Sequence, residues 1–222
     1  LDGMLTAGIG ATAIPYEQHP TSGLLQKRLI EQTRTLYRRN DFSEPLAVSQ
    51  LESLALPFEI YTLAFIPSLL SELYGSRVDE SMLLEGGYVR DGMGWWVPSG
   101  RVYFSPPQTD GPDVEHTYAS QHFFLPLRFH NPFEAVTTID YDPHDLLTEQ
   151  MRDAVGNLIT AGERDENDRL TTSGNDYRML QPRLIMDANR NRAAVAFDAL
   201  GMVVGTAVMG KPEESVGDSL DG

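Results

Sequence analysis

The chain has 222 residues and a formal net charge of −15 at neutral pH, with 17 Lys and Arg against 32 Asp and Glu. This balance disfavours a sequence-independent grip on nucleic acid or on anionic membranes. The lack of cysteine excludes disulfides, thiolate metal sites and a thiol nucleophile. No apolar run reaches the length of a membrane span, so we expect no direct membrane insertion.

The first part of the chain predicts a linker followed by strands. Residues 1–23 are small, glycine-rich and interrupted by prolines, which is typical of a loop or linker. In LLQKRLIEQTRTLYRR, β-branched and aromatic residues over Ile30–Tyr37 favour a strand over a helix. LALPFEIYTLAF carries apolar groups on both faces, which predicts a strand covered on both sides. We expect residues 24–135 to form one β-rich segment.

Two short helices are expected near residues 67–86. PSLLSELYG places Pro67 at a helix start and Gly75 just past its end, and DESMLLEGG offers Asp79 or Ser81 as a cap and Gly86 as a stop. From Gly87 onward the pattern predicts only strands and turns. Asp91-Gly92 and Ser99-Gly100 are the expected turn pairs between aromatic-rich runs.

The second half contains a repeat. A shift of 34 residues aligns TTIDYDPHDLLTEQMRDAVGN (137–157) with TTSGNDYRMLQPRLIMDANRN (171–191), and FDALGMVVGT (197–206) gives a shorter echo. Such a period indicates one supersecondary unit stacked on its neighbours. We expect repeats over 136–210, with 161–173 as an exposed charged insertion and 211–222 as an acidic connector. The turn and repeat positions are Tyr141, Asp142, Asp153, Asn157, Asp176, Tyr177, Asp187, Asn191, Phe197, Asp198 and Gly201.

These stretches resemble a known family. YDPHDLLTEQMRDAVGN and NDYRMLQPRLIMDANRNRAAVAFDALGMVVGTAVMGK are similar to the YD (RHS) repeats of the TcB component of bacterial insecticidal toxin complexes, which are TcaC/TcdB-like and SpvB-related. SQLESLALPFEIY and EGGYVRDGMGWWVPSGRVYFSP resemble the part just ahead of those repeats. The resemblance covers roughly residues 24–218. The order Asp176-Tyr177 departs from it, because it reverses that of Tyr141-Asp142.

The resemblance implies a mainly β fold, a spirally wound sheet of stacked hairpins that forms a hollow shell. It implies a secreted, non-catalytic structural segment that encapsulates a cytotoxic cargo and needs no cofactor. The implied partner is a TcC-like RHS protein that completes the shell and carries the cargo at its C-terminal end. A TcA-like translocation channel would be contacted only through parts of the family outside this stretch.

Several chemical alternatives were weighed against structural roles. Asp187, Asn189, Asn191 and Asp198 match positions of a calcium loop, but Arg192 stands where that loop needs glycine, so plain turns are favoured. GTAVMGKP (205–212) differs from a phosphate-binding loop at Pro212, so we expect a strand. Asp140 and Asp142 offer a carboxylate pair for a hydrolase, yet turn capping is favoured. His116, His122, His130 and His144 are too scattered for a metal pair.

Trp95-Trp96 supports the main alternative function, a carbohydrate-binding or cell-surface β module. Adjacent residues on a strand point to opposite faces, so only one of the two rings could join a flat platform. Packing in the core or between strands is therefore favoured for both.

Overall fold

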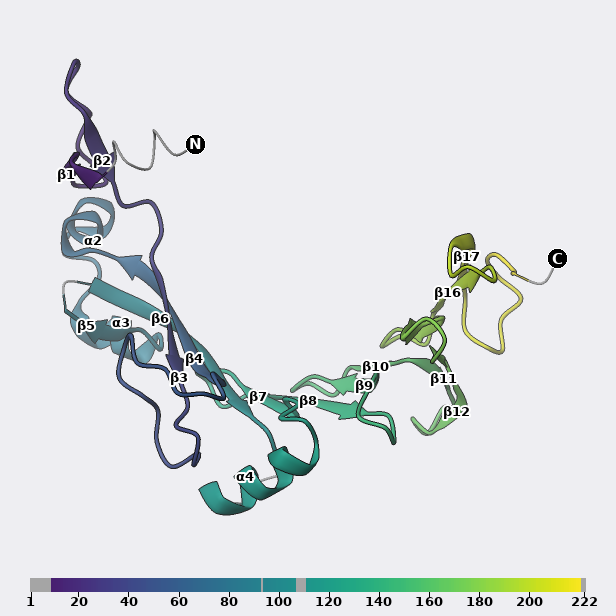
Figure 1. The fold of residues 1–222 in the computed structure, drawn as a ribbon. Helices are drawn as coiled ribbons and strands as arrows, with labels where there is room; N and C mark the ends of the chain where they lie inside the picture. The colour runs from purple at the N-terminus through teal and green to yellow at the C-terminus, as the bar shows by residue number, and fades with distance from the viewer. Residues whose placement is uncertain (1–8, 93, 107–110, 221–222) are drawn as a thin grey trace. The chain divides into compact units, whose positions relative to one another are not determined.

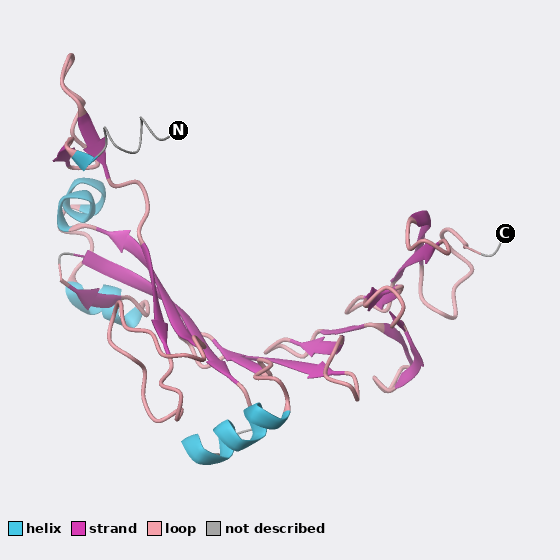
Figure 2. Ribbon diagram, viewed as in Figure 1, coloured by secondary structure: helices cyan, strands magenta, loops and turns pink. Residues whose placement is uncertain are grey.

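The computed structural model describes residues 9–92, 94–106 and 111–220, and they form a mainly β, antiparallel fold with short helices, as predicted (Figures 1 and 2). The chain divides into two compact units. The first comprises residues up to Arg101 together with Asn131–Phe133, and the second comprises Val102–His130 and the chain from Glu134 onward. Each unit is described by itself.

The first unit is a small twisted sheet with two helices. Its elements are β1 (Thr12–Ile14), β2 (Gln26–Arg28), β3 (Thr33–Tyr37), β4 (Pro57–Phe65), α2 (Pro67–Tyr74), α3 (Glu80–Glu85), β5 (Val89–Asp91) and most of β6 (Gly94–Tyr103). β6 pairs with both β5 and β4, and β4 pairs with β3, all antiparallel. β1 and β2 pair separately in parallel, so residues 12–14 of the expected linker form a strand.

The two predicted helices begin and end where the capping residues indicated. α2 starts at Pro67, and the Gly75 N–H donates to the Ser71 carbonyl at its end. The Asp79 side chain accepts the Met82 N–H at the start of α3. Each helix is too short to be stable alone, so packing against the sheet must hold both.

The second unit is a series of hairpins. Its elements are α4 (Pro112–Gln121), β7 (Arg128–His130), β8 (Val136–Tyr141), β9 (Thr148–Arg152), β10 (Leu158–Thr160), β11 (Gly162–Arg164), β12 (Leu170–Ser173), β13 (Asn175–Asp176), β14 (Gln181–Pro182), β15 (Leu184–Met186), β16 (Arg192–Phe197) and β17 (Val203–Met209). The main strand order is β7-β8-β9-β10-β15-β16-β17. β11 pairs with β12, and β13 with β14.

Three sequence expectations need correction. α4 was not predicted, because its apolar residues do not form a clear stripe; Pro112 at its first turn is its main signal. Ser99-Gly100 is not a turn, since both residues lie within β6, where Gly100 has φ 94° next to a register shift. Residues 161–173 form the β11–β12 hairpin, and Arg164 within it is 2% exposed rather than solvated.

Two glycines allow the close backbone approach beside this hairpin. A Cβ on Gly174 would lie 2.3 Å from the Leu184 carbonyl oxygen, and one on Gly162 would lie 2.0 Å from that of Thr172. Both contacts are with backbone, which cannot move aside as a flexible side chain could. The hairpin therefore requires glycine at these positions.

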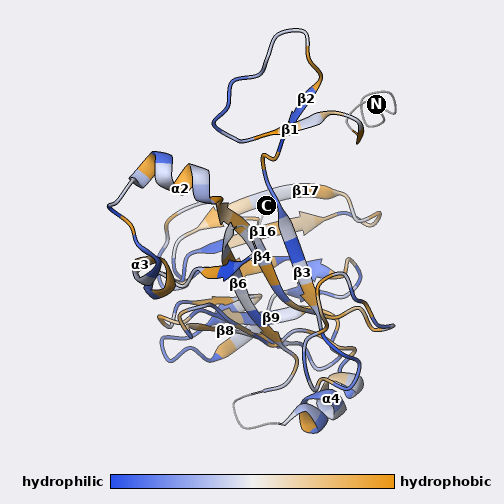
Figure 3. Cartoon of the chain, turned by 90° about the vertical axis from the view of Figure 1, so that its left-hand side faces the viewer, coloured by the Kyte–Doolittle hydropathy of each residue, from blue (hydrophilic) through white to orange (hydrophobic). Residues whose placement is uncertain are grey.

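Polar and apolar residues are mixed along the strands (Figure 3), but burial alternates along some of them. In β10, Leu158 and Thr160 are buried and Ile159 is exposed, and in β17 Ala207 is buried between exposed Thr206 and Val208. Residues 216–218 fold back along β17, where the Gly210 N–H donates to the Val216 carbonyl and the Asp218 N–H to that of Val208. Parts of β10 and β17 thus bury one face.

Candidate functional site: the aspartate-capped hairpin loops

Five hairpin loops of the second unit share one design. Each begins with an aspartate whose carboxylate accepts N–H groups of its own loop, and each has a residue with positive φ three positions later. The aspartates and their positive-φ partners are Asp142 with Asp145, Asp153 with Gly156, Asp165 with Asp168, Asp187 with Arg190, and Asp198 with Gly201. The aspartate therefore sets the loop from within its own sequence.

The loops that start at Asp153 and Asp187 match closely. Oδ1 of Asp153 accepts the N–H groups of Val155 (3.0 Å) and Asn157 (2.8 Å), and the Asn157 side-chain amide donates to Oδ2 at 2.8 Å. Asp187 makes the equivalent bonds with Asn189 and Asn191 at 2.8, 2.8 and 3.1 Å. The pKa of Asp153 is lowered, chiefly by the hydrogen bond from the Asn157 side chain and also by those from backbone N–H groups. Together these hydrogen bonds outweigh burial, which alone would raise the pKa.

Asp142 is the buried member of the row. It is 3% exposed, and its carboxylate accepts the N–H groups of Leu146 and Leu147, both at 2.7 Å, and the Tyr177 hydroxyl at 2.8 Å. Burial raises the pKa of Asp142, but these donors outweigh it, so the pKa lies below its ordinary value. Tyr177, the second residue of the reversed pair Asp176-Tyr177, thus donates its hydroxyl to an aspartate 35 residues earlier in the sequence.

Most of the remaining repeat positions also have structural partners. The Tyr141 hydroxyl donates to the Pro126 carbonyl at 3.1 Å. Asp176 accepts the N–H groups of Arg178 and Met179, as a turn residue would. Phe197 ends β16 directly before the Asp198 loop, where the Ala196/Phe197 step is a register irregularity.

Sequence reasoning missed the arginines that join one hairpin to the next. Arg164 donates from Nη2 to the Asp187 carbonyl (2.5 Å) and from Nη1 to Thr160 Oγ1 (3.3 Å) and the Met186 carbonyl (3.4 Å). Its Nε lies 3.4 Å from Asp168 Oδ1, an ion-pair distance without hydrogen-bond geometry. Burial lowers the pKa of Arg164, and Asp168 opposes that shift. Only the three-dimensional structure brings these groups together.

Arg192 makes a second link of the same kind. Its guanidinium donates to Glu163 Oε1 at 2.6 Å, to the Gly210 carbonyl at 3.0 Å and to the Lys211 carbonyl at 3.3 Å. Arg164 and Arg192 thus each bind carbonyls of a neighbouring segment, and Arg192 also pairs with Glu163 in β11. Buried or half-buried arginine is suited to this because its five donors lie in one fixed plane.

The calcium-loop residues do not form one site. Both carboxylate oxygens of Asp187 accept donors of its own loop, and Asp198 lies beyond β16, roughly 20 Å from Asn191 at about 3.3 Å per strand residue. Oδ1 of Asp198 accepts the N–H groups of Leu200 and Met202. Among the described residues, no group of three or more His, Cys, Asp or Glu side chains is placed to hold a metal ion.

The phosphate-loop and hydrolase alternatives also meet structural obstacles. Residues 205–209 of GTAVMGKP lie in β17, paired with β16, rather than in a loop. Asp142 is saturated by the donors already described, whereas Asp140 is exposed and receives the Gln150 side-chain amide. The two carboxylates are thus held in different environments, one as a buried loop cap and one as a surface partner of β9.

Trp95 and Trp96 form no binding platform, because they are 6% and 5% exposed. The Arg34 guanidinium lies 3.7 Å from the Trp96 ring centroid, and Trp96 Nε1 donates to the Asp91 carbonyl at 3.2 Å. Trp95 lines a pocket of about 270 Å³ in the first unit, together with residues of α2, α3 and β5. The glycan-binding alternative is therefore wrong for these residues: both rings are part of the core.

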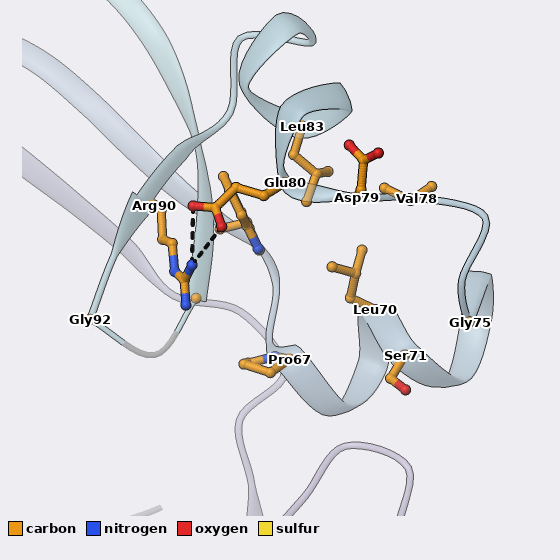
Figure 4. Close-up of a pocket in the computed structure, with 12 residues that line it drawn as sticks. Pro67, Leu70, Ser71, Gly75, Val78, Asp79, Glu80, Leu83, Arg90 and Gly92 are labelled. Carbon is orange, nitrogen blue, oxygen red and sulfur yellow. Dashed lines mark hydrogen bonds and ion pairs between the residues drawn. The ribbon is translucent and has the colours of Figure 1, made fainter.

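Arg90 and Glu80 form an ion pair in that pocket (Figure 4). Arg90 Nη1 donates to both carboxylate oxygens of Glu80, at 3.1 and 3.0 Å. Leu70, Val78 and Leu83 also line the pocket. The second carboxylate of the wall, Asp79, accepts the Met82 N–H and the Ser81 hydroxyl as the cap of α3. Among the described residues, no helix is long and apolar enough to cross a membrane.

The fold is similar to parts of solved Tc toxin complexes. Crystal structures of TcdB2–TccC3–Cdc42 and of TcdB2–TccC3 match with a TM-score of 0.54 and 22% identity, over 81% and 80% of this chain. A Photorhabdus luminescens Tc holotoxin pore matches with a TM-score of 0.55 and 20% identity over 81%. In each case this chain spans 8% of the matched chain. No protein-family model and no curated protein matches.

At this level of identity the likeness defines the fold. The chain has a Tc toxin-related fold, a mainly antiparallel β segment built of hairpins with aspartate-capped loops.

Proposed function

We propose that this chain is a non-catalytic wall segment of a TcB-like protein, part of a hollow shell of YD (RHS) repeats that encloses a cytotoxic cargo. The observation that carries the proposal is the row of aspartate-capped hairpins joined by buried arginines. One hairpin buries too little apolar surface to be stable in water, whereas consecutive hairpins bury one face continuously. An extended wall is the use that this construction favours.

The side chains of the loops also favour a structural role. Both carboxylate oxygens of Asp153 and Asp187 accept N–H groups of their own loops. In Asp142 one oxygen accepts loop N–H groups and the other accepts the Tyr177 hydroxyl. A catalytic carboxylate needs a free oxygen near the reacting atom. We therefore propose that the segment acts without catalysis and without a cofactor.

We propose a TcC-like RHS protein as the partner that completes the shell and contributes the cargo. The likeness to TcdB2–TccC3 complexes over about four fifths of this chain supports this assignment. The matched chains are many times longer than this one, which fits a segment of a larger wall. The complex would be secreted, and a TcA-like channel would bind outside this stretch.

The first test is an immunoblot of native extract against this segment after gel filtration. We expect a polypeptide several times larger than 24.7 kDa that co-elutes with a second large chain. A free species near 24.7 kDa with no companion would contradict the proposal.

The second test asks whether this stretch seals a compartment. In the isolated complex, an enclosed cargo should resist added protease, and Arg164→Ala in this stretch should make it sensitive because adjacent hairpins lose their link. Arg169→Ala is the matched control, since Arg169 is exposed in the same loop and its side chain makes no hydrogen bond within the described residues. Equal protection in both variants would argue against a sealing wall here.

A further inference from the structure

A small polar cavity lies in the second unit between α4 and β8. Its volume is about 140 Å³, and it is lined by Tyr118, His122, Leu125, Leu127, Asp140, Tyr141 and Asp145. Tyr118 and His122 come from the end of α4, and the two aspartates from β8 and the loop after it. None of the repeat bonds described above uses Asp140, Asp145, Tyr118 or His122 as a side-chain partner. The cavity is therefore free for another role.

The walls of the cavity are fixed by contacts among its own residues. The Tyr118 and His122 rings stack with centroids 4.1 Å apart and planes 19° from parallel. His122 Nδ1 donates to Asp145 Oδ2 at 2.9 Å, and the Asp140 carboxylate receives the Gln150 amide on Oδ2. Each carboxylate is thus held through one oxygen.

Three acceptors remain unfilled among the described residues: Oδ1 of Asp145, Oδ1 of Asp140 and the Tyr118 hydroxyl oxygen. Burial, then Asp145 and Asp140, raise the pKa of Tyr118, so both carboxylates act on this hydroxyl. The cavity wall carries two carboxylates and neither Lys nor Arg, and its histidine, His122, is paired with Asp145. It is suited to a cation with several donors.

The choice of cation follows from the carboxylate oxygens already in use. Arginine is recognised best when one carboxylate offers both oxygens to its planar fork. Asp145 and Asp140 each offer one, since His122 and Gln150 occupy the others. A lysine ammonium, with three donors pointing in separate directions, matches three separate acceptors instead.

An exposed aromatic residue follows His122, a residue of the cavity wall, in the sequence. Phe123, the residue after His122, is 73% exposed, and both Phe123 and Phe124 have φ of 54°. Left-handed backbone is unfavourable for bulky residues, and two in succession require the surrounding structure to hold them. The chain thus presents an apolar ring to solvent one residue from the acidic cavity.

We propose that this cavity receives the ammonium of a lysine side chain on a partner protein, with Phe123 packing against an apolar residue next to that lysine. The net charge of −15 would attract such a basic partner segment. The inference does not rest on the shell function, because it is drawn from this cavity alone.

The probe is the peptide acetyl-Leu-Lys-Leu-amide, titrated into the ¹⁵N-labelled 222-residue chain and followed by amide chemical shifts. We expect saturable shifts at Tyr118, His122 and Asp145. Acetylation of the lysine Nε removes the charge and should weaken binding at least about tenfold, and the arginine peptide should bind less well than the lysine peptide. Equal binding of the acetylated or the arginine peptide would overturn the proposal.

Asp145→Asn tests the site without disturbing its backbone. Asparagine tolerates the left-handed conformation that Asp145 adopts at φ 55° and keeps an oxygen for His122. We expect about tenfold weaker binding, since a charge-assisted hydrogen bond is lost. Glu166→Gln removes the same charge from an exposed loop residue and should leave binding unchanged. If both variants bind alike, the attraction is only the net charge and the cavity has no such role.

Two further arms separate a protein segment from a free amine. Butylamine carries the ammonium without flanking residues and should bind several-fold more weakly than the peptide. Phe123→Ala should abolish that difference by weakening only the peptide. If butylamine binds as tightly as the peptide, the protein-segment proposal fails. These readouts are independent of cargo protection, so either proposal can fail alone.

Discussion

The two units of this chain obtain their order in different ways. In the first, β3, β4 and β6 meet through pairs distant in sequence, such as Leu63 with Trp96, and arginines lie over aromatic rings between them. In the second, each loop is set by an aspartate that bonds N–H groups two to five residues away. Long-range packing orders one unit, and local hydrogen bonding orders the turns of the other.

This difference has a consequence for how each unit responds to mutation. A long-range core loses many contacts at once when a large ring is removed, whereas a local loop loses only its own bonds. The loops of the second unit depend on distant residues at few points, among them the arginine links and the Tyr177–Asp142 hydrogen bond. Substitutions in the two units should therefore differ in size and in reach.

The largest effect is expected in the first unit. Trp96→Ala should destabilise the chain by about 4 kcal/mol, because a buried ring and its contact with Arg34 are both lost. Urea unfolding measures the change, and amide exchange should show lost protection over β3–β6. Val97→Ala, at a neighbour that is 42% exposed, serves as control and should cost well under 1 kcal/mol. Similar costs for both would mean that the tryptophan does not hold this core.

Arg164→Met should be the most damaging arginine change in the second unit. The methionine fills part of the volume but leaves the Asp187 carbonyl and its neighbours without a donor, which costs about 3 kcal/mol. Amide exchange should rise over β11–β12 and β15 while β3–β6 stay protected. Arg169→Met is the exposed control. Loss of protection in the first unit instead would show that the two units are not ordered independently.

The local part of this design was predictable from sequence. Asp153, Asn157, Asp187 and Asn191 repeat at a fixed interval, and an aspartate before a small or left-handed residue indicates a turn whatever surrounds it. Helices α2 and α3 were predictable for the same reason, because their caps lie beside them in sequence. Turns and helix ends that are fixed by residues a few positions away can be predicted from one sequence.

The links between distant segments could not be predicted. Arg164 stands in GERDENDRL, where charge density alone favours exposure, and only the fold brings it to the Asp187 carbonyl. Tyr177 and Asp142 are 35 residues apart, and nothing in either neighbourhood indicates their hydrogen bond. The cavity beside Phe123 combines a helix that was not predicted with a loop that was.

The equivalent loops at Asp153 and Asp187 provide a smaller, local test. Asp153→Ala should accelerate amide exchange at Val155 and Asn157 about tenfold or more, because both N–H groups lose their acceptor, with little change elsewhere. Asp187→Ala should do the same at Asn189 and Asn191. Asp153→Asn, which keeps an oxygen, should have a weaker effect. Exchange that rises across both loops in a single variant would contradict local ordering.

The smallest effect concerns pH and the hydroxyl that reaches Asp142. Because the pKa of the folded Asp142 carboxyl lies below its ordinary value, its contribution to stability is present above about pH 4 and is lost as the pH falls through the folded-state pKa. Tyr177→Phe removes one of its donors, so the folded-state pKa should rise towards its ordinary value. The loss of stability should then be smaller and should be complete at a higher pH. Carboxyl ¹³C shifts measured against pH report this directly.

The control for this substitution is Tyr141→Phe, which removes a hydroxyl that donates to the Pro126 carbonyl rather than to Asp142. It should leave the Asp142 titration in place while costing a similar amount of stability at neutral pH. If Tyr177→Phe leaves the Asp142 pKa unchanged, the backbone N–H groups of its own loop are sufficient to hold this carboxylate. The Tyr177–Asp142 hydrogen bond would then be dispensable, and the loop at Asp142 would be ordered by its own hydrogen bonds.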